Sequence, residues 1–388
     1  MRSKPLEGLR VLDLTRLLPG PLATQHLADY GAEVIKIEDT GAGDYARTMG
    51  AMKGDTSYFY RIVNRGKKSI RLDLKQAAGR ELFLRLVEGA DVVVEGFRPG
   101  VMDKLGLGYA TLAATNPKIV LCSISGYGQT GPYALRAGHD INYIGYAGVL
   151  DQIGTAGGAP AISNLQIGDL LGGTMSALFG LLVAIIDARA TGQGRHVDVS
   201  MTDAALAHAI FPLAEVLAHG KVQPRGEDLL TGGVPCYGVY ETADGRHMAV
   251  GSLEEKFWSM LCDALERPDL KPGHLSTGEK GARVKGELAA IFATRTQAQW
   301  VQHFDGIDCC VTPVLRVEES LQDPQLRARG MFVEVDGVTQ FAPPVAMSDF
   351  SPATLTPAPA AGADTDAVLT TLGLDAAEIR RLRDAGVV

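Results

Sequence analysis

The chain has 388 residues, of which 46% are apolar and 21% are charged, as in ordinary soluble globular proteins. The net charge of −8 argues against a nucleic-acid partner, and the length is too great for one compact core, so two domains are expected. Five cysteines without any CxxC spacing predict a reduced, cytoplasmic protein rather than a disulfide scaffold.

The first 125 residues alternate short apolar strands with helices, and the connections between them are short. This pattern predicts a parallel α/β sheet. The first strand–helix turn lacks the GxGxxG spacing, which argues against a nicotinamide dinucleotide ligand. We expect loop and irregular helix over 41–64, helices at 22–30 and 77–88, and strands at 10–14, 32–37, 91–95 and 118–124.

Two segments of this half are candidates for binding an anion. Residues 65–75 combine a basic cluster with a short strand, and residues 96–100, GFRPG, form a turn at the carboxyl end of a strand. In an open α/β sheet, ligands bind outside the carboxyl ends of the strands, so both segments could face a phosphate-bearing ligand. The alternative is that these basic residues form a solvated face, which for any one of them is at least as good an explanation.

The second half begins with the most apolar run of the chain, residues 170–186. Its glycines predict a buried core helix rather than a membrane span. The glycine-rich, polar segment 220–235 is typical of a linker. The remaining expected elements are a strand at 193–200, a helix at 203–218, a hairpin at 237–242 and 247–250, helices at 254–265, 279–294 and 298–304, a strand at 310–315, a hairpin at 331–341 turning at 336–337, an extended tail at 351–364, and closing helices at 367–373 and 376–385.

The glycine-rich loop 126–143 carries the polar side chains best suited to chemistry. His139 lies in this loop, Asp169 precedes the apolar run, and Glu254 follows the hairpin. A histidine and an aspartate on opposite faces of a carbon could move a proton α to a carbonyl, because imidazole titrates near neutrality and burial raises the pKa of a carboxyl. The alternatives are structural: His139 in a loop contact, Asp169 as a helix cap with a lowered pKa, and Glu254 as a helix start.

The sequence resembles the family III CoA-transferase (CaiB/BaiF) superfamily over nearly its whole length. The similar segments are residues 5–11, 32–38, 72–75, 97–100, 126–132 and 364–388. The resemblance implies an α/β fold with a Rossmann-like large domain, a small α+β domain, and an interlocked, intertwined homodimer. The large domain is expected over 1–200 and again over 343–388, linkers over 201–233 and 318–342, and the small domain over 234–317.

Within this superfamily, the segment 138–143, GHDINY, and Glu254 resemble the racemases, in which a histidine and an aspartate are the two bases. The resemblance implies that Glu254 orients His139, that Tyr143 orients Asp169, and that the backbone N–H of Asp140 binds the thioester oxygen of an enolate. The alternative is a CoA-transferase with Asp169 as its nucleophile, and a CoA-binding protein without activity is a third hypothesis.

The implied substrate is an acyl-CoA thioester, with coenzyme A as part of the substrate and no metal or redox cofactor. No nucleic acid or membrane is expected as a partner. One departure from the racemases is acidic Asp39, near which those proteins tend to have an arginine for the CoA phosphates. The residues expected to bind CoA are Arg65, Leu72, Asp73, Lys75, Gly96, Phe97, Arg98, Lys104, Arg136, Ala137 and Gly138.

Overall fold

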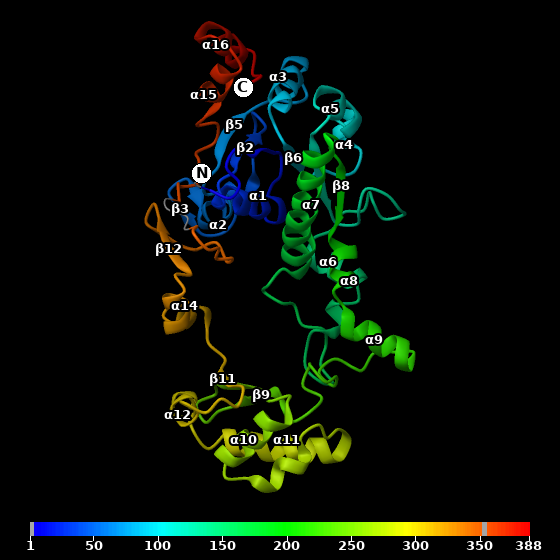
Figure 1. Ribbon diagram of the computed structural model, residues 1–388, viewed down its shortest axis with the longest axis vertical. Coiled ribbons are helices and arrows are strands. Elements are labelled where there is room, and N and C mark those ends of the chain that lie inside the picture. The colour runs from blue at the N-terminus through cyan, green and yellow to red at the C-terminus, as the bar shows by residue number, and fades with distance from the viewer. Residues whose placement is uncertain (1–3, 351–354) are drawn as a thin grey trace. The chain divides into compact units, whose positions relative to one another are not determined.

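The computed structural model describes residues 4–350 and 355–388. The chain divides into two compact units (Figure 1). Unit 1 consists of residues 1–148, 163–208 and 327–388, and unit 2 of residues 149–162 and 209–326. Unit 2 includes the small domain expected over 234–317 and extends beyond it into the segments expected to be linkers.

Unit 1 is built on a parallel six-stranded sheet with the order β5-β2-β1-β6-β7-β8. When the six strands are renumbered by their order along the chain, the sheet reads 3-2-1-4-5-6, which is the doubly wound arrangement. The direction of winding changes between its first and fourth strands, β1 and β6. Each strand predicted for this sheet is present, and the predicted bounds differ from the observed ones by at most three residues. The strands are β1 (Arg10–Asp13), β2 (Glu33–Glu38), β5 (Lys68–Arg71), β6 (Val92–Glu95), β7 (Val120–Ser125) and β8 (His196–Ser200).

Helices cover both faces of this sheet because successive strand residues point to opposite sides. On one face, Leu12 and Val93 pack with Phe83 of α3 (Ala77–Glu88). On the other, Val11 and Val92 pack with helices α1 (Pro19–Asp29) and α7 (Ser176–Thr191). The first face also receives α4 (Val101–Lys104), α5 (Tyr109–Thr115), α15 (Thr365–Thr371) and α16 (Ala376–Asp384).

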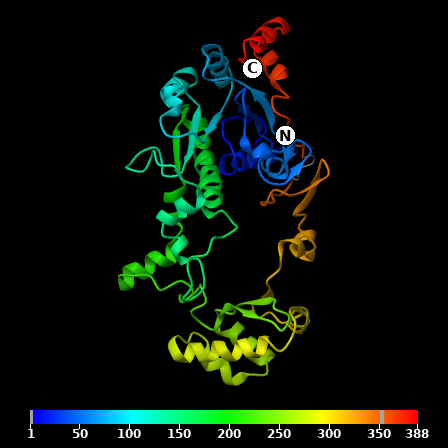
Figure 2. The same cartoon turned by 180° about the vertical axis from the view of Figure 1, so that it is seen from behind.

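The C-terminal segment returns to the sheet beside its edge strand β5 (Figure 2). Ser69 N–H donates to the Asp364 carboxylate at 2.8 Å, and Arg71 N–H donates to the Thr365 hydroxyl at 3.1 Å. These bonds satisfy donors of an edge strand that would otherwise be open. The predicted tail at 351–364 lies partly outside the described residues, whereas both predicted closing helices are confirmed.

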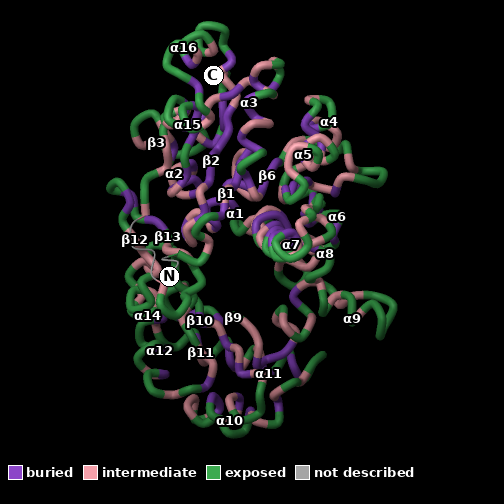
Figure 3. Tube along the Cα trace, turned by 45° about the horizontal axis from the view of Figure 1, so that its top comes forward, coloured by how far each residue is buried: buried purple, intermediate pink, exposed green. Residues whose placement is uncertain are grey.

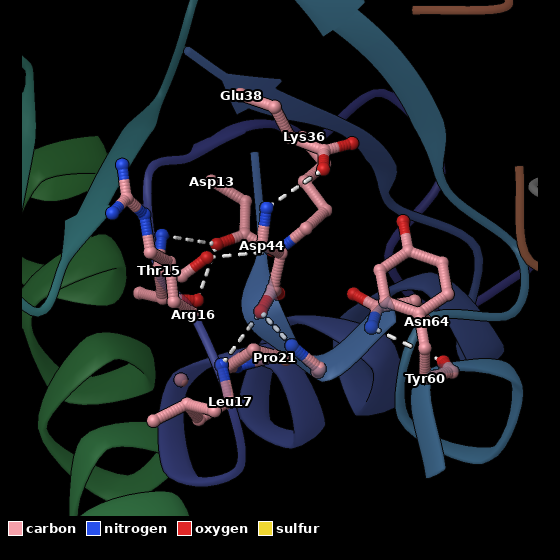
Figure 4. A network of polar contacts seen from close by, with 12 residues as sticks. Asp13, Thr15, Arg16, Leu17, Pro21, Lys36, Glu38, Asp44, Tyr60 and Asn64 are labelled. Atoms are coloured by element: carbon pink, nitrogen blue, oxygen red, sulfur yellow. Dashed lines mark hydrogen bonds and ion pairs between the residues drawn. The ribbon is translucent and has the colours of Figure 1, made fainter. Parts of the chain in front are cut away.

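A network of buried charges lies at the carboxyl end of β1 (Figure 4). The Asp13 carboxylate accepts hydrogen bonds from Thr15, Thr24 and Lys67. Lys36 Nζ is 2.8 Å from both the Thr15 carbonyl oxygen and the Asp44 carboxylate. Each buried charge therefore faces an opposite one, which is the condition for keeping ions away from water.

Segment 41–64 is mainly loop and short helix, as predicted, but it also forms a short hairpin that was not predicted. It contains η1 (Tyr45–Thr48), a two-residue hairpin pair β3 (Met52–Lys53) and β4 (Thr56–Ser57), and α2 (Tyr58–Val63).

The apolar run predicted as a buried helix forms the π-helix η3 (Gly168–Met175) followed by α7. Among the described residues, Gly168–Thr191 is long and apolar enough to cross a membrane, judged by length and composition only. In its most apolar window, 39% of the residues are buried inside the protein. Leu181 and Ile185 pack on the sheet, whereas Phe179 is 73% exposed on the opposite side. The prediction of a buried core helix therefore holds for one side only: α7 has one buried and one exposed apolar side (Figure 3).

The helix expected at 203–218 is two helices, α8 (Met201–Ala207) and α9 (Ile210–His219). Pro212 explains the break. It lacks an N–H and fits only the first turn of a helix, so a new helix must begin just before it. None of the residues of α9 is buried, although most of them are apolar (Figure 3).

Unit 2 contains an antiparallel sheet with the order β11-β10-β9 and a core around Trp258, Phe292 and Trp300. The predicted hairpin is confirmed, as are the three helices after it. The elements are β9 (Tyr237–Glu241), β10 (His247–Gly251), α10 (Glu255–Ala264), η4 (Pro268–Gly273), α11 (Gly278–Phe292), α12 (Gln297–His303), β11 (Val311–Pro313) and α13 (Val317–Ser320).

The chain then passes through α14 (Pro324–Ala328) into a second hairpin, β12 (Phe332–Val335) and β13 (Val338–Phe341). Asp336 and Gly337 have φ of 53° and 63°. Positive φ at both central residues is the requirement of a tight two-residue hairpin turn, so the predicted Asp-Gly turn is confirmed.

Candidate active site

His139 is the residue immediately before helix α6 (Asp140–Tyr146), and its backbone is extended. Asn142 fixes this position: its side-chain oxygen accepts the His139 N–H at 3.0 Å, while its own N–H donates to the His139 carbonyl at 2.8 Å. This reciprocal pair is the bonding pattern that starts a helix. The exposed imidazole is thereby carried on a fixed backbone rather than on a free loop.

Asp169 lies in the first turn of η3. Its backbone N–H donates to the Asp140 side chain at 3.0 Å, which brings the starts of α6 and η3 together. Burial and the nearby Asp140 charge raise the pKa of the Asp169 carboxyl to about 6, and His139 acts in the opposite direction. Desolvation and a like charge therefore outweigh the helix terminus, which by itself would lower this pKa.

Tyr143 packs its buried ring against two glycines of the loop, Gly126 and Gly138. A Cβ at Gly138 would lie 2.7 Å from the ring, so only glycine fits there. The Tyr143 hydroxyl donates its proton to the Gly138 carbonyl. Tyr143 thereby fixes the backbone before His139, a role that was not predicted, and its role in orienting Asp169 stays a prediction. Burial and nearby Asp169 raise the pKa of its hydroxyl to about 12.

The turn that carries Asp169 is held by close backbone packing. A Cβ at Gly172 would lie 2.6 Å from the Met201 carbonyl oxygen of α8, and one at Gly173 would lie 2.6 Å from the side chain of Pro19. The Thr174 hydroxyl donates to the Pro19 carbonyl at 2.8 Å. The adjacent glycines thus let η3 approach both neighbours, and π-helical turns of this kind recur at functional sites.

A cavity of about 500 Å³ opens beside His139, and we call it the His139 cavity. It lies where β6 and β7 end and α6 begins. It is lined by eight of the residues predicted for the site: Gly96, Phe97, Arg98, Arg136, Ala137, Gly138, His139 and Tyr143. The structure therefore brings the predicted turn after β6 and the predicted catalytic loop to one cavity.

A second cavity of about 290 Å³ lies at the carboxyl ends of β1 and β2, and we call it the Lys75 cavity. It is lined by predicted residues Leu72, Asp73, Lys75 and Phe97, together with Arg16 and Asp39. Phe97 lines both cavities. The two cavities flank the point between β1 and β6 where the winding reverses, which is where open α/β sheets bind ligands.

Five predicted residues line neither cavity: Asp140 and Asp169, which lie at the starts of α6 and η3, and three that lie elsewhere. Arg65 is only 2% exposed, and its guanidinium donates to the Asp29 carboxylate at 2.8 and 2.9 Å. Arg65 is therefore a structural ion pair and not a ligand for CoA, which corrects that prediction. Lys104 is exposed at the end of α4 and lines neither cavity. Glu254 precedes α10 in unit 2, and its interaction with His139 stays a prediction.

Sequence reasoning missed Glu95, the last residue of β6. It is 3% exposed, and its carboxylate accepts the Phe97 N–H at 2.6 Å. Burial raises the pKa of Glu95 to about 7. The sequence did contain a sign of its importance, because Glu95 is an acidic residue at the end of an apolar strand, just before the turn that lines the His139 cavity. Arg16 was also missed, because the residues around it in the first strand–helix turn are apolar.

The structure thus sets His139 against the cavity and Asp169 at the adjoining helix start, which Asp140 links to α6. The Asp169 carboxyl, whose pKa is raised to about 6, can hold or release a proton near neutral pH. The N–H of Asp140, at the first helical position of α6, has no acceptor within the helix and can stabilise developing negative charge on an oxygen. Among the described residues, no group of three or more histidine, cysteine or acidic side chains is arranged for a metal ion.

Sequence and structure comparisons agree on one family. The profile of CoA-transferase family III matches residues 6–365. The chain is 34% identical to the alpha-methylacyl-CoA racemase of Homo sapiens, covering 99% of this chain and 97% of that one. It is 36% identical to the acetyl-CoA:oxalate CoA-transferase of Acetobacter aceti, covering 89% of this chain and 90% of that one. A crystal structure of a CaiB/BaiF family protein from Brucella suis matches with a TM-score of 0.83 and 30% identity, covering 96% and 100% of the two chains.

Proposed function

The chain belongs to CoA-transferase family III, and on that basis we propose that it interconverts the two enantiomers of 2-methylacyl-CoA thioesters. The observation that carries this proposal is the Asp169 carboxyl, whose pKa is raised to about 6 and which lies within electrostatic range of His139. A carboxyl with a pKa near neutrality can return a proton, which a two-base racemase requires.

In the proposed reaction, one of the two bases removes the α-proton and the other returns a proton to the opposite face. When His139 takes the proton, the C–H bonding electrons pass into the thioester and form an enolate. The Asp140 N–H donates to the enolate oxygen, and Asp169 supplies the new proton. For the other enantiomer the two bases exchange roles. No metal or redox cofactor enters these steps.

The CoA part of the substrate is proposed to occupy the His139 and Lys75 cavities. Contacts far from the reacting carbon would supply binding energy that holds the carbon between the two bases. Gly96–Arg98 and Ala137–Gly138 line the path, and Lys75 carries a positive charge at its far end. Lys104 remains a candidate for the nucleotide.

We also propose the interlocked homodimer, in which Glu254 hydrogen-bonds and orients the His139 ring. Exposed apolar helices support association. Leu217 of α9 is 78% exposed, α9 buries none of its residues, and α7 exposes Phe179. Apolar surface of this extent is typical of an interface between protein chains. Sedimentation of the purified protein tests this point, because a monomer at micromolar concentration contradicts it.

A CoA-transferase is the second candidate, with Asp169 as nucleophile. One observation favours it: the Acetobacter transferase is as similar to this chain as the human racemase is. In that reaction the ionised Asp169 would attack the thioester carbonyl and release CoA thiolate, leaving an acyl anhydride on the enzyme.

One experiment separates the two candidates. A single 2-methylacyl-CoA enantiomer is incubated in D2O with the purified protein and no added acid, with proton NMR for the α-proton and chiral chromatography for the product. Racemisation with deuterium incorporation supports the proposal, and His139→Ala and Asp169→Ala should then each cost several orders of magnitude while CoA binding is kept. No exchange, with CoA moving only after a second carboxylic acid is added, identifies a transferase. Hydroxylamine would then trap the acyl-enzyme.

A further inference from the structure

Arg16 places a guanidinium in the Lys75 cavity. The residue follows β1, directly at the point where the winding of the sheet reverses. Its side chain is 30% exposed, one terminal nitrogen donates to Asp39 at 2.7 Å, and the other donates to the Tyr45 hydroxyl at 2.9 Å. An arginine has five N–H donors, so these two bonds leave others available to a ligand.

Asp39 acts as a fixed support for this arginine. Its other carboxylate oxygen accepts the Gly41 N–H at 2.9 Å and the Gly43 N–H at 3.2 Å. The carboxylate therefore cannot turn away without losing two backbone hydrogen bonds. Asp39, the acidic residue at which the resemblance to the racemases fails, thus holds a cation in the same cavity.

The backbone on both sides of Arg16 is also fixed. Thr15 donates through its N–H and its hydroxyl to buried Asp13, and Leu17 donates its N–H to Asp44 at 3.1 Å (Figure 4). Leu17 has a positive φ of 65°, which is uncommon for a side chain of this kind. The buried charge network therefore maintains an unusual turn whose one exposed charged side chain is Arg16.

The acidic residues of the Lys75 cavity already have partners. Glu38 is paired with Arg47 at the back of the cavity. Asp73 accepts the Lys75 N–H at 3.0 Å and the Gln76 side chain at 3.1 Å. These hydrogen bonds hold the Asp73 carboxylate toward its own turn, and the cationic residues that line the cavity beside it are Arg16 and Lys75. Arginine binds phosphate well because its planar fork matches the phosphate oxygens.

We infer, on the basis of the proposed function, that Arg16 binds a phosphate group of the CoA nucleotide, with Asp39 as the residue that positions it. The two candidate phosphates are the diphosphate bridge and the ribose 3′-phosphate. Both are recognised by the same chemistry, and the series CoA, dephospho-CoA and pantetheine distinguishes them.

The test is calorimetric binding of CoA, dephospho-CoA and pantetheine to the full-length protein. Arg16→Ala should weaken the binding of CoA about tenfold, which corresponds to roughly 1.4 kcal/mol, and should leave the binding of pantetheine unchanged. Loss of the effect with dephospho-CoA assigns the 3′-phosphate, and persistence assigns the diphosphate. Arg16→Lys keeps the charge and should recover part of the affinity. The matched control is Arg10→Ala at the opposite end of β1, where the guanidinium pairs with Glu33 at 2.7 Å.

Asp39→Asn separates ligand binding from a structural role. Asparagine keeps an oxygen for the Gly41 and Gly43 N–H groups but turns an NH2 donor toward the Arg16 guanidinium, which is itself a donor. Arg16 then loses its support, so CoA should bind more weakly to this variant while pantetheine binding is unchanged. The inference is overturned if Arg16→Ala leaves CoA binding unchanged, if it weakens pantetheine equally, or if Asp39→Asn leaves CoA binding as tight as in wild type. A wild type that binds CoA without racemising or transferring it overturns the proposed function alone. A wild type that does not bind CoA overturns both.

Discussion

The side-chain oxygen of Asp140 accepts the backbone N–H of Asp169 at 3.0 Å, across 29 positions of sequence. This one contact joins the helix that begins after His139 to the helix that carries Asp169. It also sets a carboxylate beside a carboxylate, and this like charge adds to burial in raising the pKa of Asp169. The same residue therefore fixes the position of the proposed acid and tunes its chemistry.

Asp140→Asn should move the acid-side fall of the pH–rate profile to lower pH. Asparagine keeps an oxygen for the Asp169 N–H but removes the negative charge, so the pKa of Asp169 falls from about 6 toward its ordinary value. The measurement is the pH dependence of α-proton exchange, read as the titration of the His139–Asp169 pair. An unchanged acid side would mean that Asp169 is not the group titrating there.

Glu95→Gln should change how stability depends on pH. The pKa of Glu95 is raised in the folded protein from 4.5 to about 7, so its contribution is fully present below pH 4.5 and is lost as the pH rises through 7. The variant keeps an acceptor for the Phe97 N–H and does not titrate. Relative to wild type, it should gain on the order of 3 kcal/mol in free energy of unfolding between pH 4.5 and 8. Urea unfolding at several pH values tests this, and parallel curves for the two proteins would refute it.

Gly172→Ala should destabilise unit 1 and reduce turnover. The new Cβ would meet the Met201 carbonyl oxygen at 2.6 Å, and because that atom belongs to the backbone, the turn of Asp169 has to shift. We expect a loss of about 1–3 kcal/mol in thermal or urea unfolding. The control is Gly145→Ala in α6, where an added Cβ meets no atom within 4 Å, and a gain of about 0.5–1 kcal/mol is expected. Equal effects of the two substitutions would show that the close approach does not matter.

Asp13→Asn should cost about 3–5 kcal/mol of stability, because it leaves the buried Lys67 ammonium without its counter-charge at 2.9 Å. The matched control is Glu33→Gln, which removes a carboxylate that pairs with Arg10 and Lys68 at the surface, and about 1 kcal/mol or less is expected there. Urea unfolding of both variants gives the comparison. A loss below 1 kcal/mol for Asp13→Asn would contradict the assigned role of the pair.

Most elements could be predicted because they depend on local signals. The alternation of apolar strands and helices predicted the parallel sheet, and Asp-Gly at 336–337 predicted a hairpin turn. The predictions that failed depended on one residue or on a tertiary contact. Pro212 divided one expected helix into α8 and α9. The exposed side of α7 could not be predicted, because it depends on which face of the helix packs on the sheet.

The sequence by itself determined the family, the sheet and the loop that carries His139, since these follow from local patterns and from motifs read along the chain. The tertiary structure alone decided the partners of the charged side chains. It buried Arg65 against Asp29, 36 positions away, directed the Tyr143 hydroxyl to Gly138, paired Arg16 with Asp39, and set Asp140 beside Asp169. The physical reason is that a pKa and an ion pair depend on burial and on the charges within a few ångströms, and folding chooses those neighbours from distant parts of the chain.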